Sequence, residues 1–162
     1  MKVGVKVKIT TARLLLSETM LKEFELRLSI KLPQDYRDFM LEHNGGYPAE
    51  AWDFDFIETG IDKSTSSIVS EFYSIDAPDK KTYNDIATRY VDLVNASLIP
   101  PSLIPIADDV FGNPILLSVS GDDYGHVYFA NHELEDTETR YMVMSPIADS
   151  FTEFISKLYI ED

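Results

Sequence analysis

Seven residues between positions 108 and 133 could together bind a metal ion or transfer a proton: Asp108, Asp109, Asp122, Asp123, His126, His132 and Glu133. Carboxylate and imidazole side chains of this kind suit zinc, manganese or iron. The spacing matches no metal-binding signature, however, because His132-Glu133 is only the first half of His-Glu-x-x-His. The sequence favours a structural role, in which Asp108 and Asp109 accept backbone N–H groups in a turn, Asp122 and Asp123 cap a hairpin, and His132 fastens a strand end.

Other enzymatic motifs have even less support. Gly45-Gly46 and Gly112-Asn113 do not follow the strand, glycine spacing and helix of a phosphate-binding loop. The chain has no cysteine, and no serine lies in a Gly-x-Ser-x-Gly turn. We therefore expect a protein that is not an enzyme, with no catalytic residue, no metal and no cofactor. A small metal-dependent hydrolase is the disfavoured alternative.

The overall charge restricts the class of partner. The formal net charge is −14, from 28 acidic and 14 basic residues. Direct binding to nucleic acid or to an anionic membrane is disfavoured, because both need a cationic face. An acidic surface instead accelerates association with a basic protein partner, although such a charge also simply keeps a protein in solution. The N-terminus lacks the apolar core of a signal peptide and no apolar run is long enough to span a membrane, so we expect a cytoplasmic protein.

Acidic residues are the best candidates for contacts with such a partner. Trp52, Phe54 and Phe56 alternate with Asp53 and Asp55, which predicts a strand with one aromatic and one carboxylate face. The aromatic row could bind a partner, but a row of this period more often lies in the core of a sheet. The candidate partner-binding residues are Asp53, Asp55, Glu58, Asp122, Asp123, Glu133 and Glu135.

Helix signals occur at four places. Ser17 is a suitable N-cap for a helix that ends near Ile30, and Pro33 opens a second helix that stops at Asn44-Gly45-Gly46, where we expect a glycine in the left-handed conformation. Thr82 with Asp85 resembles a capping box, and so does Ser150 with Glu153, which opens a closing helix.

Alternating apolar residues predict several strands between these helices. The expected segments are a lysine-bearing strand over 3–9, a strand over 52–56, a polar linker over 63–67, a strand over 68–75, a hairpin of 115–119 with 127–129 around a loop at 121–125, an acidic loop over 134–138 and a short strand over 141–144. Short turns join neighbouring strands. We therefore expect one α+β domain over residues 1–162, with a mainly antiparallel sheet flanked by helices.

Three blocks of sequence resemble the SMI1/KNR4 superfamily, also called SUKH. They are Leu32-Pro33-Gln34-Asp35-Tyr36-Arg37-Asp38-Phe39 with His43-Asn44-Gly45-Gly46, then Ile104-Pro105-Ile106-Ala107-Asp108-Asp109 with Gly112-Asn113 and with Val127-Tyr128-Phe129 leading to His132-Glu133, and finally Ser150-Phe151-x-x-Phe154. Their order and spacing extend the resemblance over about residues 17–158. The resemblance implies the single-domain fold of that family.

Bacterial members of this superfamily are largely immunity proteins against toxins. The resemblance thus implies a protein that binds a cognate toxin domain and neutralises it by occlusion, and the acidic charge adds a basic nuclease as a candidate toxin. The alternative is a regulatory or scaffolding module for protein–protein interaction without a toxin partner, as in eukaryotic relatives. The sequence leaves the identity of the toxin, the contacting segment and the oligomeric state open.

Overall fold

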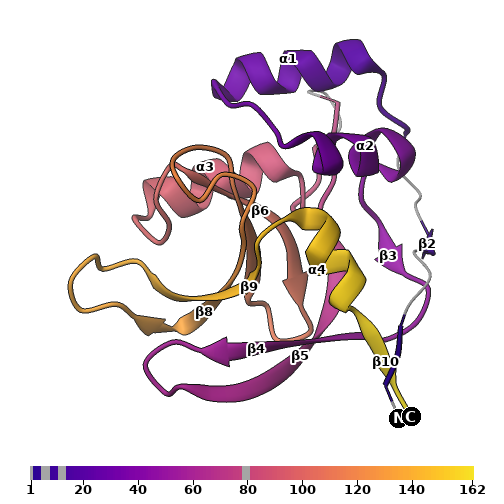
Figure 1. The fold of residues 1–162 in the computed structure, drawn as a ribbon. Helices are drawn as coiled ribbons and strands as arrows, with labels where there is room; N and C mark the ends of the chain where they lie inside the picture. Colours follow the sequence, from indigo (N-terminus) through magenta and orange to yellow (C-terminus); the bar gives the residue numbers. More distant parts are fainter. Residues whose placement is uncertain (1, 5–7, 11–13, 78–80) are drawn as a thin grey trace.

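The structure is a computed structural model that describes residues 2–4, 8–10, 14–77 and 81–162, and within these residues eight strands form one antiparallel sheet (Figure 1). In spatial order the strands are β1 (Lys2–Gly4), β10 (Tyr159–Glu161), β4 (Trp52–Glu58), β5 (Lys63–Phe72), β6 (Leu103–Asp109), β7 (Pro114–Ser118), β8 (Val127–Glu135) and β9 (Met142–Ala148). Two short strands, β2 (Ile9–Thr10) and β3 (Tyr47–Pro48), form a separate pair.

The large sheet curls until strands from distant positions in its order meet. Phe56 of β4 stacks on Phe129 of β8 with 4.3 Å between ring centroids. Just beyond β4, the Thr59 N–H donates to Ser145 Oγ of β9 at 2.9 Å. The inner face of the curl is therefore closed by aromatic packing, and Trp52, Phe54 and Phe56 are all buried there. The prediction that the aromatic row belongs to the core is confirmed.

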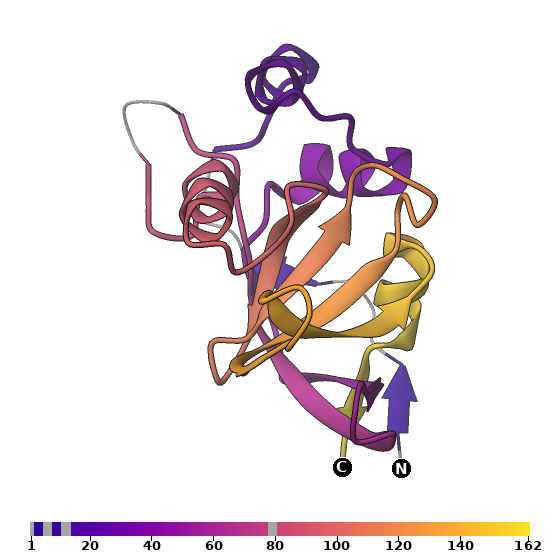
Figure 2. The same cartoon turned by 90° about the vertical axis from the view of Figure 1, so that its left-hand side faces the viewer.

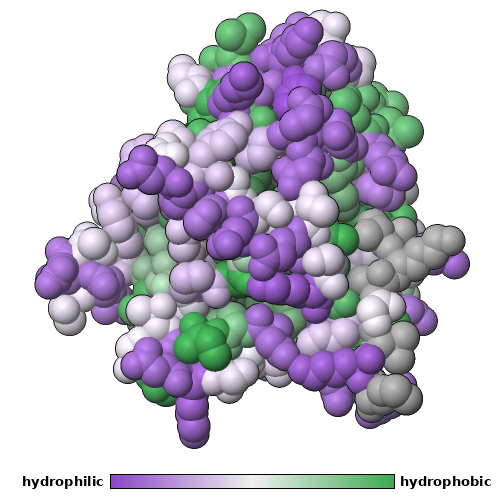
Figure 3. All heavy atoms as spheres, viewed as in Figure 1, coloured by the Kyte–Doolittle hydropathy of each residue, from purple (hydrophilic) through white to green (hydrophobic). Residues whose placement is uncertain are grey.

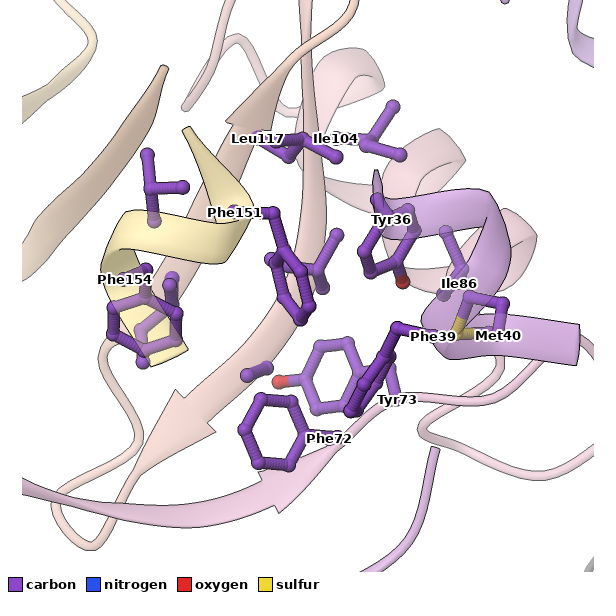
Figure 4. Close-up of a cluster of buried hydrophobic side chains, with 14 of the residues drawn as sticks. Tyr36, Phe39, Met40, Phe72, Tyr73, Ile86, Ile104, Leu117, Phe151 and Phe154 are labelled. Atoms are coloured by element: carbon purple, nitrogen blue, oxygen red, sulfur yellow. The ribbon is translucent and has the colours of Figure 1, made fainter. Parts of the chain in front are cut away.

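Helices cover both faces of this sheet: α1 (Glu18–Leu28), α2 (Gln34–His43), α3 (Ile86–Asn95) and α4 (Phe151–Lys157). Figure 2 shows α3 on one side of the strands and α4 on the other. Tyr36 and Phe39 of α2 pack against Phe151 of α4 with ring centroids 5.0 and 4.8 Å apart (Figure 4). On the opposite face, α3 contributes Leu93 to a smaller cluster with Leu116 of β7. The predicted α+β fold with a mainly antiparallel sheet is confirmed.

Several local predictions are also confirmed. Ser17 Oγ accepts the Met20 N–H at 3.2 Å and opens α1, and Ser150 Oγ accepts the Glu153 N–H at 3.0 Å and opens α4. The predicted hairpin exists, because Ile115 pairs with Phe129 and Leu117 pairs with Val127. Its loop is longer than the five expected residues, since β7 ends at Ser118 and β8 begins at Val127.

Other local predictions are wrong where long-range contacts decide the structure. The supposed polar linker over 63–67 is the first half of β5, because its backbone pairs with β4 from Lys63↔Glu58 to Ser67↔Phe54. The segment predicted as an acidic loop over 134–138 begins within β8, which extends to Glu135. The helix α4 does not close the fold, since β10 follows it and pairs with β1 and β4.

One helix end differs from the prediction and another agrees with it. Asp85, rather than Thr82, is the N-cap of α3, because Asp85 Oδ2 accepts the Thr88 N–H at 2.9 Å. At the end of α2, Gly45 takes the left-handed conformation with φ 74°, as expected, and Asn44 before it is also left-handed, with φ 48°. The Asn44 amide donates to Leu14 O and Ile75 O and its Oδ1 accepts the Ile75 N–H, so one side chain joins three segments.

The two ends of the chain lie side by side (Figure 1). Lys2 pairs with Glu161 and Gly4 pairs with Tyr159. The lysine-bearing strand predicted over 3–9 corresponds to β1 and β2, which lie in different sheets, while positions 5–7 lie outside the described residues.

Candidate functional site

The antiparallel order brings three turns to the same end of the sheet. These turns connect β4 to β5, β6 to β7, and β8 to β9. In Figure 1 the hairpins β4–β5 and β8–β9 extend in the same direction. We call this end the hairpin-tip surface and define it by Glu58, Ile61, Phe111, Glu133, Leu134 and Glu135.

Side-chain hydrogen bonds hold the three turns in fixed relative positions. Asn113 Oδ1, in the β6–β7 turn, accepts the His132 N–H at 3.0 Å and lies 2.6 Å from His132 Nδ1. Asn131 Nδ2 donates to Glu58 Oε1 at 3.3 Å, and Asn131 Oδ1 accepts the Glu133 N–H at 3.0 Å. The surface is therefore organised before any partner binds, which lowers the entropic cost of association. His132 fastens a strand end, as the sequence predicted.

Asp109 supports the surface from below. It is buried, and its two oxygens accept hydrogen bonds from Phe111 N–H, Asn113 N–H, Asn113 Nδ2 and Ser67 Oγ at 2.7 to 3.0 Å. The turn that displays Phe111 is thus built on a satisfied carboxylate, as predicted for Asp109. The same prediction is wrong for Asp108, whose Oδ2 accepts the Tyr73 hydroxyl at 3.0 Å.

The exposed residues of this surface combine apolar and acidic groups. Phe111 is 74% exposed, Ile61 55% and Leu134 40%. The carboxylates of Glu58, Glu133 and Glu135 belong to the same surface, and the charge of Glu135 is balanced within the chain by Arg140, whose Nε donates to Glu135 Oε1 at 3.1 Å. Elsewhere, in the view of Figure 3, hydrophilic side chains dominate and hydrophobic ones form small separate patches. Exposed aromatic and aliphatic anchors within a polar rim are typical of protein-binding sites.

Asp53 and Asp55 lie on the face of β4 opposite its buried aromatic row, beside β10. Burial alone would raise the pKa of Asp55, but hydrogen bonds from the Lys2 ammonium and the Tyr159 hydroxyl hold it below its usual range. Burial, together with the charges of Glu161 and Asp55, raises the pKa of Asp53. Asp55 already has a cationic partner within the chain, so this patch offers less unbalanced charge than the sequence suggested.

Asp122 and Asp123 lie in the β7–β8 loop, at the opposite end of β8 from Glu133 and Glu135. Partial burial alone would raise the pKa of Asp123. The hydroxyls of Tyr128 and Ser118 donate to the carboxylate, however, and hold this pKa below its usual range. These bonds agree with the predicted role of Asp123 in capping the hairpin. The structure therefore brings Glu58, Glu133 and Glu135 together and separates them from the other four candidates.

Sequence reasoning missed the apolar part of the hairpin-tip surface. Phe111 lies in a tight turn between Asp109 and Gly112, directly after Val110, and both apolar side chains are exposed, Phe111 to 74% and Val110 to 49%. Two adjacent large apolar residues in a turn of a sheet are a signal for a binding surface that could have been used. Ile61 gave no comparable signal.

The structure also bears on metal binding and on membrane insertion. Across residues 2–4, 8–10, 14–77 and 81–162, no group of three or more His, Cys, Asp or Glu side chains is placed to hold a metal ion. Over the same residues, no helix has the length and apolar character needed to cross a membrane.

Comparison with known proteins decides the family. The model of the SMI1 / KNR4 family (SUKH-1) matches residues 15–157. The chain belongs to this family. The match agrees with the resemblance expected over residues 17–158. The chain is also similar to the SPbeta prophage-derived uncharacterized protein YokK of Bacillus subtilis (strain 168), with 28% identity over 153 residues that cover 87% of this chain and 73% of that protein.

The SMI1/KNR4 blocks identified in the sequence mostly form the core of the structure. Tyr36 and Phe39 in the first block and Phe151 and Phe154 in the last are buried. Figure 4 shows them converging between α2, α4 and the sheet. These buried residues therefore report the SMI1/KNR4 fold and offer no surface for contact with another protein.

Proposed function

We propose that this protein is an immunity protein that binds a cognate toxin domain through the hairpin-tip surface and neutralises it by occlusion. It acts in the cytoplasm, as one domain spanning residues 1–162, and performs no chemistry of its own. Membership of the SMI1/KNR4 family (SUKH-1) supports the class of function. The observation that carries the choice of surface is the exposed Phe111, held among carboxylates by the Asn113–His132 and Asn131–Glu58 contacts.

The charge supports a basic toxin, with a nuclease as the leading candidate. The net charge of −14 accelerates encounter with a cationic surface, and the effect weakens as salt screens it. A nuclease must present a cationic cleft to its nucleic acid, so carboxylates can cover the cleft by mimicking the charge of phosphates. Apolar anchors such as Phe111 then slow dissociation.

The test is co-expression with the toxin domains encoded beside this gene, read as restored growth and as co-purification. The hypothesis predicts that one neighbouring product is bound and neutralised. If no neighbour is bound or neutralised, an immunity function is ruled out and the alternative of a regulatory or scaffolding module takes its place.

Variants locate the surface once a bound toxin is in hand. We expect Phe111→Ala to raise the dissociation rate about tenfold or more, as truncation of an interface anchor does. Leu134→Ala should weaken binding, whereas Leu26→Ala, the same truncation at an exposed position of α1, should not. Replacing Glu58, Glu133 and Glu135 by glutamine should slow association at low salt and matter less at high salt. A larger effect from Asp122→Asn would move the contact to the β7–β8 loop.

A further inference from the structure

A groove of about 760 Å³ lies between α1 and the start of α2, and it combines exposed apolar side chains with lysines. Tyr124 of the β7–β8 loop completes its lining. In Figure 1, α1 lies at the top of the molecule, away from the β4–β5 and β8–β9 hairpins. This α1–α2 groove is therefore separate from the hairpin-tip surface.

The apolar side chains of the groove are accessible to a partner. Leu26 is 79% exposed and Tyr124 is 42% exposed. Ile30, which lines the same groove, is half-buried. A side chain that covers Leu26 would remove most of its apolar surface from water, which favours binding.

Hydrogen bonds fix the shape of the groove. The Tyr124 hydroxyl donates to Lys31 O at 2.8 Å and so joins the β7–β8 loop to the connection between α1 and α2. Glu25 Oε2 accepts the Leu32 N–H at 2.8 Å, and Glu25 Oε1 accepts from Arg37 Nη2 at 2.8 Å. The groove is therefore preformed, which lowers the entropic cost of binding.

The cations of the groove are of two kinds. Arg37 is paired with Glu18 and Glu25, with 2.8 Å to an oxygen of each. Lys22 and Lys31 are exposed, and no ion pair between the described residues includes either of them. With three cations and two carboxylates in its lining, the groove is net positive on a protein with a net charge of −14.

The groove between β10, β9 and α4 also contains two lysines, but both are paired within the chain. Lys157 Nζ lies 2.6 Å from Glu153 Oε1, and Lys2 binds Asp55. The α1–α2 groove differs from it because its lysines lie beside an exposed leucine and are available to a partner.

We propose that the α1–α2 groove is a docking site for an acidic segment of a second protein partner, one that carries a large apolar side chain between carboxylates. The apolar side chain covers Leu26 and Tyr124, and the carboxylates pair with Lys22 and Lys31 around them. The inference goes beyond the proposed function and does not depend on a toxin partner.

Two other occupants fit the groove less well. The phosphates of a nucleic acid would meet the two glutamates of the groove and the negative charge of the whole protein. A second copy of this chain would bring together two molecules that each carry a net charge of −14.

The probe is the peptide acetyl-Glu-Asp-Leu-Leu-Asp-Glu-amide, titrated into the isotope-labelled full chain at pH 7 and followed by amide chemical shifts. We expect saturable shifts at the residues of α1 that line the groove, at 30–32 and at Tyr124. One control peptide has serine in place of both leucines, and another has asparagine and glutamine in place of the acidic residues. Each should bind about tenfold more weakly, because each lacks one part of the contact.

Two variants test the two parts of the groove. Leu26→Ala removes the apolar contact, and Lys22→Gln/Lys31→Gln removes the two unpaired cations. Each should weaken binding of the peptide about tenfold. The altered side chains are exposed, and the spread of amide signals shows whether each variant is folded.

Matched controls make the same changes elsewhere. Leu134→Ala truncates an exposed leucine of the hairpin-tip surface, and Lys8→Gln/Lys63→Gln removes two exposed lysines outside the groove. Both should bind the peptide as tightly as the parent. Leu26 and Leu134 should thus have opposite effects on the peptide and on a toxin bound at the hairpin-tip surface.

Three results would overturn the proposal. The first is a set of peptide-induced shifts that survives Leu26→Ala or Lys22→Gln/Lys31→Gln. The second is a single-stranded DNA oligonucleotide that shifts the same residues at lower concentration than the peptide, which would assign the groove to nucleic acid. The third is a dimer in analytical ultracentrifugation that Leu26→Ala abolishes, which would assign the groove to a second copy of the chain.

Discussion

At the scale of single residues, two neighbouring aspartates differ in how their carboxylate oxygens are hydrogen-bonded. Asp109 has hydrogen-bond donors on both oxygens. Asp108, on the opposite side of β6, receives the Tyr73 hydroxyl on Oδ2, but its buried Oδ1 has no hydrogen-bond partner. Burial raises the pKa of Asp108 to about 6, with a further contribution from the negative charge of Glu71, while Tyr73 and Arg89 act in the opposite direction.

This difference predicts a pH dependence that Asp108→Asn should remove. The pKa of Asp108 is about 6 in the folded protein against 3.8 for an unperturbed aspartate, so the folded state binds a proton more readily than the unfolded state between these values. Its contribution to stability is therefore complete below about pH 4 and is lost as the pH rises through about 6. We expect the variant to gain stability relative to the wild type between pH 4 and pH 7 in urea denaturation. A constant difference across this range would contradict the assignment.

At the scale of elements, the end of α2 depends on a glycine in close contact with β5. Gly45 has φ +74°, and a Cβ atom there would lie 2.3 Å from Tyr73 O and 2.7 Å from Phe72 O. Both obstacles are backbone atoms, which cannot rotate away. Gly112, in the β6–β7 turn, has φ +84° and no atom within 4 Å of an added Cβ.

These two glycines form a matched pair for mutation. Gly112→Ala incurs only the conformational cost of a left-handed alanine, about 1–2 kcal/mol. Gly45→Ala incurs that cost and the clash with β5, so we expect a loss of more than about 3 kcal/mol or a failure to fold. Chemical denaturation of both variants measures the difference. Equal losses would show that the helix end can move away from β5.

Local signals predicted much of the fold. Ser17 and Ser150 identified helix starts, and the alternation around Phe54 identified a core strand, because capping and burial depend on nearby residues. The strand over 63–67 was missed because its serines and threonine pair through the backbone with β4. The strand β10 was missed because its partners, β1 and β4, lie more than a hundred residues earlier in the chain.

The site was predictable only in part. Glu58, Glu133 and Glu135, grouped as candidates, lie at the same end of the sheet, but Asp123 and Glu133 were also grouped because they are close in sequence. They are separated by most of β8, whose seven residues from Val127 to Glu133 extend roughly 20 Å at about 3.3 Å per residue. Patterns of charge cannot reveal this separation, and they also gave no indication that Lys2 reaches Asp55 from the far end of the chain.

At the scale of the whole molecule, the open edges of the sheet are protected. In β9, Pro146 has no N–H to offer a neighbouring strand, the Ile147 carbonyl accepts Lys157 Nζ at 3.0 Å, and Ser145 binds the Thr59 N–H. The other edge, β1, is only three residues long and carries Lys2. Short edges, lysine and proline all oppose pairing with a second sheet. The proposed partner contacts at the hairpin-tip surface agree with this, because they lie on turns rather than on a sheet edge.

The pairing of β1 with β10 makes the polypeptide nearly a closed ring. A circular permutant that joins Asp162 to Lys2 through a short flexible linker, with new ends between Ser120 and Gly121, should fold with a stability within about 2 kcal/mol of the parent, because the join spans only neighbouring strands. Thermal unfolding measures the stability of the permutant, and its amide chemical shifts show whether it is folded. Loss of the folded chemical-shift pattern would show that folding depends on the original order of the strands in the chain. If the permutant folds, the junction between β1 and β10 is only one of several loops at which the chain can be opened.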